Sequence, residues 1–348
     1  MKKIVFLAFF VLLSGAAYSM DFSVPKHDLY DVNNWVNKKG DLQRIYATGP
    51  IESNTSGELE AFVKTNGIKS AVVLFNSPGG SLADALELGK TIRALGFSTG
   101  IASFRDGKMI QEGICASACA YAFAGGVYRY YGGGNTHLGL HQFYSQENVI
   151  SNKTSQEVSG ILVAFLQAMG VDARAFSISS LAGPDAMVWL SAEDAFRLSF
   201  SNNGIHDTVA ELKLQNKMTY LKVEQANADF DGRFLFFCIK RQIIVMAGYV
   251  TTPEDARDKV DWATRSFLAI DRDTVQEKRK SDNPNGLTSE GSVVWVDRTL
   301  TRPEIQRLVN ADSIGVGMGS DGYMTYSASA DLSSVRDKVQ NYVKNCYQ

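Results

Sequence analysis

The chain has 348 residues, of which 45% are hydrophobic and 21% charged, and its formal net charge is −2. This composition is typical of a folded globular protein with room for two domains, and it excludes a disordered, collagen-like or coiled-coil chain. The near balance of 35 basic and 37 acidic residues gives no electrostatic basis for nucleic-acid binding, and the 4 Cys and 4 His lack the spacing of a zinc site.

The first 19 residues have the pattern of a signal peptide. Lys2 and Lys3 precede the apolar run Ile4–Leu13, and small residues at Ala17 and Ser19 fit the cleavage rule. The alternative is a membrane anchor, but the run is about half the length that a membrane span needs. We therefore expect a mature chain that begins at Met20 and is periplasmic or secreted, where its cysteines can pair.

From about Ile45 to Ile205, short apolar runs alternate with segments of helical periodicity. This alternation predicts a layered α/β domain, to which we assign residues 20–224. The expected strands are Ile45–Ile51, Ala71–Phe75, Ser98–Ala102 and Leu138–His141, and the expected helices are Thr55–Lys64, Leu82–Leu95, Ala116–Ala124, Val158–Met169 and Ser191–Leu198.

The pattern changes after about Gln225, so we assign residues 225–348 to a smaller α+β accessory domain. Two apolar runs, Phe234–Ile239 and Ile243–Tyr249, predict a hairpin. The polar segment Asp271–Gly291 is expected to be an exposed loop. The other expected elements are a helix over Pro253–Leu268, strands at Ser292–Val296, Ser313–Gly317 and Tyr323–Ser329, and a final helix over Leu332–Cys346.

Three short segments in the first domain could together perform chemistry. Asn76-Ser-Pro-Gly-Gly80 lies between a buried strand and an amphipathic helix, where paired glycines allow a tight turn. Ser117 lies among small residues at the start of a helix, and His141 follows at a strand end, 24 residues later. Each segment alone has an ordinary structural explanation, but together they supply a nucleophile, a base and oxyanion donors.

These segments resemble the Clp-protease proteolytic subunit family (ClpP), within the crotonase-like superfamily. The resemblance covers about residues 45–205 and includes the further segment Leu190-Ser-Ala-Glu-Asp-Ala195. It implies a ClpP/crotonase-like layered β-α-β fold. It also implies Ser117 as nucleophile, His141 as base and an oxyanion hole formed by backbone N–H groups of the Gly79–Gly80 pair and Ala118.

The third member of the triad departs from the family pattern. The family places an Asp where this chain has Met187, and Asp185 is the nearest candidate. A carboxylate there would fix the His tautomer and stabilise the imidazolium. Exported relatives of the signal-peptide-peptidase type use a Lys base instead, for which Lys153 is the candidate, although its polar surroundings indicate a solvated loop.

Four cysteines allow three pairings, which the sequence cannot distinguish. We expect two local disulfides, Cys115–Cys119 and Cys238–Cys346. The first pair lies one turn apart in the expected helix, with Ser117 pointing the opposite way. Cys346 lies on the apolar stripe of the final helix, and Cys238 shares a strand face with Phe234 and Phe236. A cysteine protease is disfavoured because neither Cys115 nor Cys119 occupies the nucleophile position.

The leading hypothesis is therefore an exported, ATP-independent serine endopeptidase that acts on peptides or proteins. It needs no cofactor, metal or ATPase partner, and its oligomeric state stays open. The alternative is a catalytically inactive ClpP-like scaffold that binds a periplasmic partner, because a fold does not establish an activity.

Overall fold

The computed structural model describes residues 19–25, 42–144, 151–183, 185–228, 230–271, 273–282, 284–321 and 325–347. The expected signal peptide lies outside these residues, apart from Ser19. The described chain divides into two units, the first with residues 19–25 and Gln43–Ser201 and the second with Leu42 and the described residues from Asn202 onward. No helix within these described ranges combines the length and the apolar character that crossing a membrane requires.

The first unit is built on a five-stranded sheet in the order β1-β2-β3-β4-β8. Strands β2 (Gln43–Thr48), β3 (Ala71–Asn76), β4 (Ser98–Ile101) and β8 (Arg129–Tyr130) are parallel, and β1 (Asp21–Ser23) is antiparallel to β2. The first five residues of β3 are all buried, as a central parallel strand requires. Helices α1 (Thr55–Asn66) and α2 (Leu82–Ala94) connect β2 to β3 and β3 to β4, which confirms the expected alternation.

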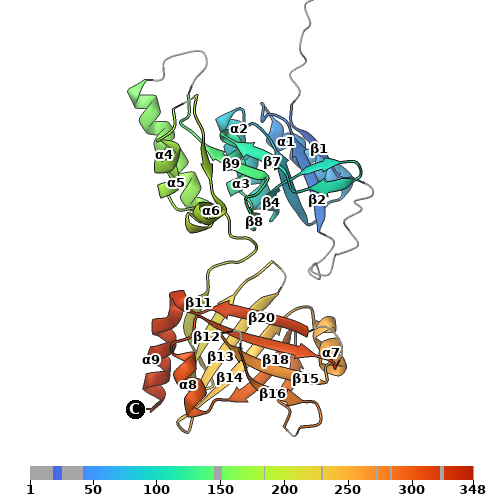
Figure 1. Ribbon diagram of the computed structural model, residues 1–348, viewed down its shortest axis with the longest axis vertical. Coiled ribbons are helices and arrows are strands. Elements are labelled where there is room, and N and C mark those ends of the chain that lie inside the picture. Colours follow the sequence, from blue (N-terminus) through green and yellow to red (C-terminus); the bar gives the residue numbers. More distant parts are fainter. Residues whose placement is uncertain are drawn as a thin grey trace, which may run out of the picture. The chain divides into compact units, whose positions relative to one another are not determined.

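A second, three-stranded sheet has the order β10-β9-β7. Strands β7 (Gly113–Ala116) and β9 (Thr136–Leu140) are parallel, and β10 (Val188–Leu190) is antiparallel to β9. Helix α3 (Ala118–Ala124) follows β7 directly, and all seven of its residues are buried. Figure 1 shows helices α4 (Asn152–Ala168), α5 (Arg174–Ser179) and α6 (Ala192–Arg197) together at one side of this unit, and the short strands β5 (Ser103–Arg105) and β6 (Lys108–Ile110) form a hairpin.

The second unit contains two antiparallel sheets. The six-stranded sheet has the order β11-β12-β13-β14-β18-β17, and the four-stranded sheet has the order β16-β15-β19-β20. Their strands are β11 (Val209–Gln215), β12 (Met218–Gln225), β13 (Asp231–Ile239), β14 (Gln242–Val250), β15 (Arg265–Ile270), β16 (Asp273–Arg279), β17 (Leu287–Glu290), β18 (Val293–Thr299), β19 (Ser313–Gly319) and β20 (Thr325–Asp331). Alternate residues of both sheets form one apolar core, so this unit is mostly β with helices at its surface.

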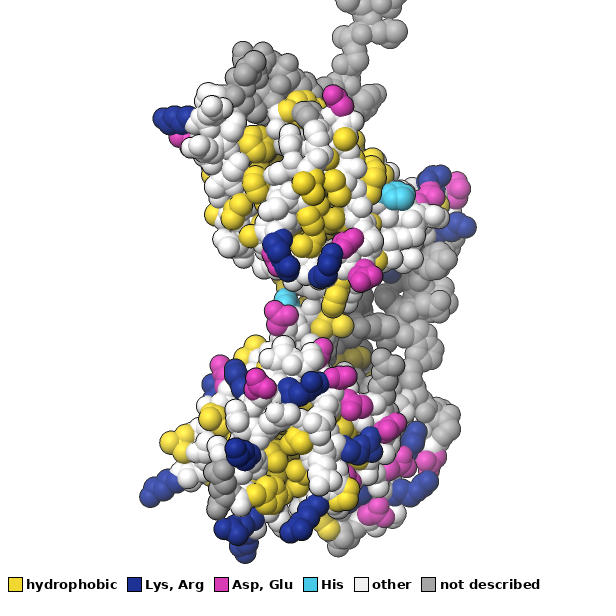
Figure 2. Space-filling model, turned by 60° about the vertical axis from the view of Figure 1, so that its left-hand side comes forward, with side chains coloured by type: hydrophobic (Ala, Val, Ile, Leu, Met, Phe, Trp, Pro, Cys, Tyr) yellow, Lys and Arg dark blue, Asp and Glu magenta, His cyan; other side chains and the backbone are white. Residues whose placement is uncertain are grey.

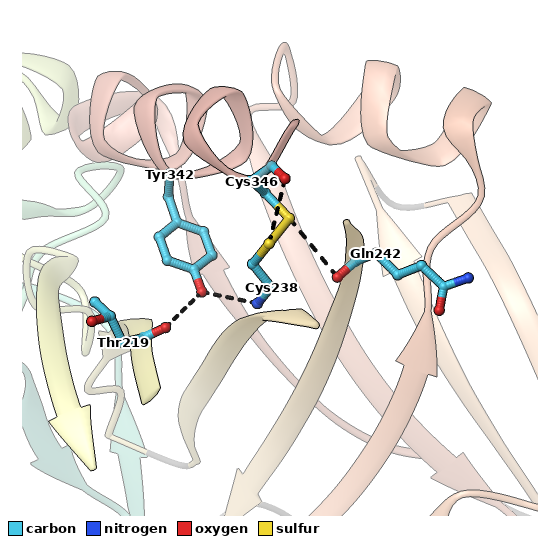
Figure 3. The surroundings of a disulfide bond; sticks show 5 residues. All are labelled: Thr219, Cys238, Gln242, Tyr342 and Cys346. Carbon is cyan, nitrogen blue, oxygen red and sulfur yellow. Dashed lines mark hydrogen bonds between the residues drawn. A yellow bond between two sulfur atoms is a disulfide. The ribbon is translucent and has the colours of Figure 1, made fainter. Parts of the chain in front are cut away.

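Helices α7 (Pro253–Trp262), α8 (Arg302–Leu308) and α9 (Arg336–Tyr347) complete this unit. The Cys238–Cys346 disulfide joins β13 to α9, and Tyr342 adds a polar tie between α9 and the sheet (Figure 3). The Tyr342 hydroxyl donates to the carbonyl of Thr219 at 3.1 Å and accepts from the N–H of Cys238 at 3.1 Å. Helix α9 is therefore held by a covalent bond and by hydrogen bonds to two neighbouring strands.

Several boundary predictions were wrong. Strand β12 pairs with β13 and β11 pairs with β12, so both belong to the second unit, whose main segment begins at Asn202 rather than at residue 225. The helix expected over Pro253–Leu268 ends at Trp262, because Arg265–Ile270 alternates between inward and outward side chains as a strand. The expected loop Asp271–Gly291 contains β16 and β17, whose polar character is that of sheet edges.

Both expected disulfide pairings are confirmed, and they should differ in their contribution to stability. Replacing Cys238 and Cys346 together with Ser should lower the free energy of unfolding by about 4–5 kcal/mol, since the closed loop spans 108 residues. The same change at Cys115 and Cys119 should cost about 2 kcal/mol, because only 4 residues separate them. Denaturant unfolding of both variants tests this order, and an equal loss in the two would contradict it.

Candidate active site

Ser117 lies at a sharp turn between strand β7 and helix α3. Its backbone has φ 57° and ψ −125°, a conformation that L-residues rarely adopt and that costs roughly 1–3 kcal/mol. The expected helix over Ala116–Ala124 therefore begins only at Ala118, and Cys115 lies in the strand. A strained strand-to-helix turn of this kind presents a nucleophilic serine in many hydrolases.

Bonds on several sides hold the Ser117 turn in place. The N–H of Ser117 donates to the carbonyl of Gly139 in β9 at 2.9 Å, and the N–H of Ala116 donates to the carbonyl of Ser77 at 3.1 Å. The Cys115–Cys119 disulfide, with its Cα atoms 5.1 Å apart, crosses the turn from the strand to the helix. The strain at Ser117 is thus offset by contacts made by its immediate neighbours.

The paired glycines follow β3 and approach two different parts of the chain. A Cβ atom on Gly79 would lie 2.6 Å from the carbonyl oxygen of Ala116 and 2.9 Å from Cβ of Ser117, so only glycine fits there. Gly79 also has φ 103°, which favours glycine independently. Gly80 instead lies against Ile51, whose carbonyl oxygen would be 2.1 Å from an added Cβ.

His141 reaches Ser117 because two parallel strands end at the same edge of the small sheet. Strands β7 and β9 are in register from Gly113↔Thr136 to Ala116↔Gly139, so residues that follow them emerge side by side. The distance between His141 Nε2 and Ser117 Oγ is 2.6 Å. This places a neutral imidazole within proton-transfer distance of a hydroxyl.

The far side of the His141 ring lacks the expected carboxylate. Its Nδ1 atom is buried and has no hydrogen-bond partner among the described residues. Asp185 is exposed and does not bond to this ring, so the structure does not bring the proposed triad together. Burial lowers the pKa of His141, and the backbone of Gln142 acts in the opposite direction.

Met187 lies where the antiparallel pairing of β9 and β10 would place a partner for His141. The register runs from Leu190↔Leu138 to Val188↔Leu140, and the next pair in that series is Met187 with His141. The Sδ atom of Met187 would lie 2.8 Å from a Cβ on Gly139, so this side chain covers the strand beside the site. An apolar thioether therefore occupies the place of an orienting acid.

The three expected oxyanion donors are not equivalent. Gly79 and Ala118 lie next to each other, since a Cβ on Gly79 would be 3.1 Å from the Ala118 nitrogen. The Ala118 N–H belongs to the first turn of α3, where helix geometry supplies no acceptor. The Gly79 N–H donates to Ser77 Oγ at 3.2 Å, and Gly80 faces Ile51 rather than Ser117.

The rival groups considered from sequence lie elsewhere or are chemically blocked. Lys153 is in the first turn of α4, 85% exposed, with Glu157 3.8 Å away. A lysine that acts as a general base is normally buried, and Lys153 lacks that burial. Cys115 and Cys119 are bonded to each other and cannot act as thiolate nucleophiles.

Two arginines, the buried Arg129 and the half-buried Arg93, stabilise the far end of α3, and the sequence did not single them out. Arg93 donates to the carbonyls of Gly125 and Gly126 at 2.8 and 2.9 Å, and Arg129 donates to that of Gly126 at 2.9 Å. Positive charge at a helix C-terminus complements the helix dipole. Burial, together with the charge of Arg93, lowers the pKa of Arg129 to about 10.

Comparison of the sequence with models of known protein families finds no match, and comparison with curated proteins finds no significant relative. The two disulfides nevertheless fit a protein that resides in an oxidising compartment. What the site can do must therefore be argued from its geometry.

Replacing Gly79 with Ala tests the close approach to Ser117. The added methyl group would displace the Ser117 turn by a fraction of an ångström or more, so labelling of Ser117 by a fluorophosphonate should slow by a factor on the order of 10². Gly160→Ala in α4 is the matched control, because nothing lies within 4 Å of its added Cβ. Unchanged labelling in Gly79→Ala would show that the close contact has no influence on the nucleophile.

The lowered pKa of His141 predicts the pH profile of the same reaction. The neutral imidazole is the reactive form, so labelling should stay constant through neutral pH and decline only below the ordinary His pKa of 6.5. Rates of fluorophosphonate labelling measured between mildly acidic and mildly alkaline pH test this pH dependence. A decline that begins at alkaline pH would indicate a lysine base instead.

Proposed function

We propose that the protein is an exported, ATP-independent serine endopeptidase related to the Clp-protease proteolytic subunits. The observation that carries this proposal is the 2.6 Å contact between Ser117 Oγ and His141 Nε2, at a strained turn beside Gly79. Support for the family comes from the chain order of the parts. The Gly-Gly turn follows β3, the serine follows β7 and the histidine follows β9.

In the proposed reaction, Ser117 Oγ attacks the peptide carbonyl carbon while His141 Nε2 takes the hydroxyl proton. The resulting oxyanion is held by the Ala118 N–H, and by the Gly79 N–H once this has left Ser77 Oγ. His141 then returns the proton to the departing amine, which leaves an acyl-enzyme. Water, deprotonated by His141, cleaves the ester and restores Ser117.

The lack of a carboxylate at His141 makes this centre a Ser–His dyad among the described residues. A misoriented or wrongly tautomeric histidine slows a serine protease by a factor on the order of 10⁴. We therefore expect slow turnover compared with enzymes that have a complete triad. The reaction needs no nucleotide or metal, and the expected substrate is a peptide or protein outside the cytoplasm.

The alternative function, a scaffold that binds a partner without catalysis, is favoured by a different observation. The first unit exposes large apolar side chains, including Ile161 and Phe196, on the side that carries α4 to α6. Figure 2 shows hydrophobic side chains gathered there with few charged groups among them. Such surfaces often bind other proteins.

Fluorophosphonate labelling with three variants decides between these functions. We expect labelling and peptide hydrolysis in the mature protein, none in Ser117→Ala, and a rate lower by a factor of about 10³ or more in His141→Ala. Lys153→Ala should behave as the native protein, because its side chain is exposed and paired with Glu157. Peptide hydrolysis that persists in purified Ser117→Ala would remove the serine-peptidase function.

A further inference from the structure

Strand β11 forms one edge of the six-stranded sheet in the second unit and pairs, within the described chain, only with β12. Six of its seven residues are exposed, and only Ala210 is buried. Leu212 and Leu214 are 65% and 74% exposed. The strand thus presents apolar side chains at a sheet edge where, of its backbone groups, the Ala210 carbonyl accepts a hydrogen bond from Lys338 Nζ at 2.9 Å.

The other sheet edges of this unit have the protection that isolated edges need. Strand β17 is only four residues long. The pairing of β16 with β15 contains an irregularity at Leu268/Ala269, and β16 has charged residues at both ends. Strand β20 lies close against β13, since a Cβ on Gly232 would be 2.7 Å from the carbonyl oxygen of Ser329.

Strand β11 lacks a short length and an irregular pairing, and the helix contact at its edge is the bond from Lys338 to the Ala210 carbonyl near its N-terminal end. Its pairing with β12 runs without a bulge from Val209↔Glu224 to Gln215↔Met218, and the strand contains no proline. Seven regular residues exceed the length of an average strand. An exposed edge of this kind is a template for another strand.

The sequence of β11 is complementary to itself in the antiparallel direction. When two copies pair with Leu212 opposite Leu212, Glu211 of each lies opposite Lys213 of the other, and Leu214 lies opposite Ala210. Directly opposite residues of antiparallel strands point to the same face, so these side chains meet. Within one chain, Glu211 and Lys213 already form an ion pair at 2.5 Å, which shows that both charges lie on one face.

The neighbouring registers are unfavourable. A shift of the pairing by one residue puts the two sets of side chains on opposite faces. A shift by two brings either Glu211 opposite Glu211 or Lys213 opposite Lys213, and like charges in that position are destabilising. The charge pattern therefore selects a single alignment.

We propose that β11 is a dimer interface, at which two copies of this chain join their six-stranded sheets antiparallel about a two-fold axis at Leu212. The partner is a second copy because the strand's own charges complement one another in that orientation. Pairing covers Leu212 and Leu214 and fills the backbone edge. This inference is independent of the proposed catalytic function.

Cysteine cross-linking tests the register directly. All 4 native cysteines are in disulfides, so an introduced cysteine is the sole free thiol. In the proposed dimer the two copies of Leu212→Cys face each other with Cα atoms about 4.5–5.5 Å apart, within disulfide range. The two copies of Leu214→Cys are more than about 12 Å apart, because four residues of strand separate them.

Mild oxidation of the full mature protein should therefore give a covalent dimer with Leu212→Cys and little with Leu214→Cys, read on a non-reducing gel. Equal cross-linking of the two variants would overturn the register. The interface would be overturned if Leu212→Cys did not cross-link at protein concentrations where the mature chain sediments as a dimer. A mature chain that sediments as a monomer at every concentration would overturn dimerisation itself.

Charge variants supply a second, independent measurement. Lys213→Glu should raise the dimer dissociation constant on the order of tenfold to a hundredfold, since two attractive contacts become repulsive. Lys240→Glu makes the same charge change at the β13–β14 turn and should have no such effect. Mixing Glu211→Lys with Lys213→Glu should restore dimers as mixed pairs in sedimentation. An unchanged dimer dissociation constant in Lys213→Glu would contradict the proposal.

Discussion

The backbone conformation of Ser117 is the constraint on which the first unit depends. An L-residue with φ 57° and ψ −125° persists only when its neighbours outweigh the strain. Here a disulfide crosses the turn, β9 accepts the Ser117 N–H, and Gly79 lies so near that no side chain fits. Two arginines bond the carbonyls at the other end of α3, so the helix that carries the turn is held at both ends.

The helices and strands that the sequence predicted correctly are those that short-range residue patterns encode. The continuous apolar run of β3 and the helical periodicity of α2 identified both elements, and the helix expected over Ser191–Leu198 is α6, which the Ser191 side chain caps. The polar strand β16 was not predicted, because a sheet edge needs no apolar alternation of its own. Strands β11 and β12 were assigned to the wrong domain, since only the pairing of β12 with β13, and of β11 with β12, places them in the second.

The candidate site shows the same division between local and long-range information. Ser117 and His141 were identified because each lies in a recognisable sequence segment. In the structure, Ser117 Oγ and His141 Nε2 are 2.6 Å apart. The partner of the His141 ring depends on how β10 aligns with β9, and that register places Met187, not Asp185, beside the histidine. Because strand register is set by long-range pairing, motif matching alone could not decide which side chain lies there.

The Cys115–Cys119 bond makes the covalent support of the Ser117 turn depend on the redox state of the compartment. It can form only after the chain leaves a reducing compartment, and it bridges the turn that carries Ser117. A newly made chain therefore holds this turn without its covalent brace. Under the proposed function, the turn that carries the nucleophile gains its covalent support only in an oxidising compartment.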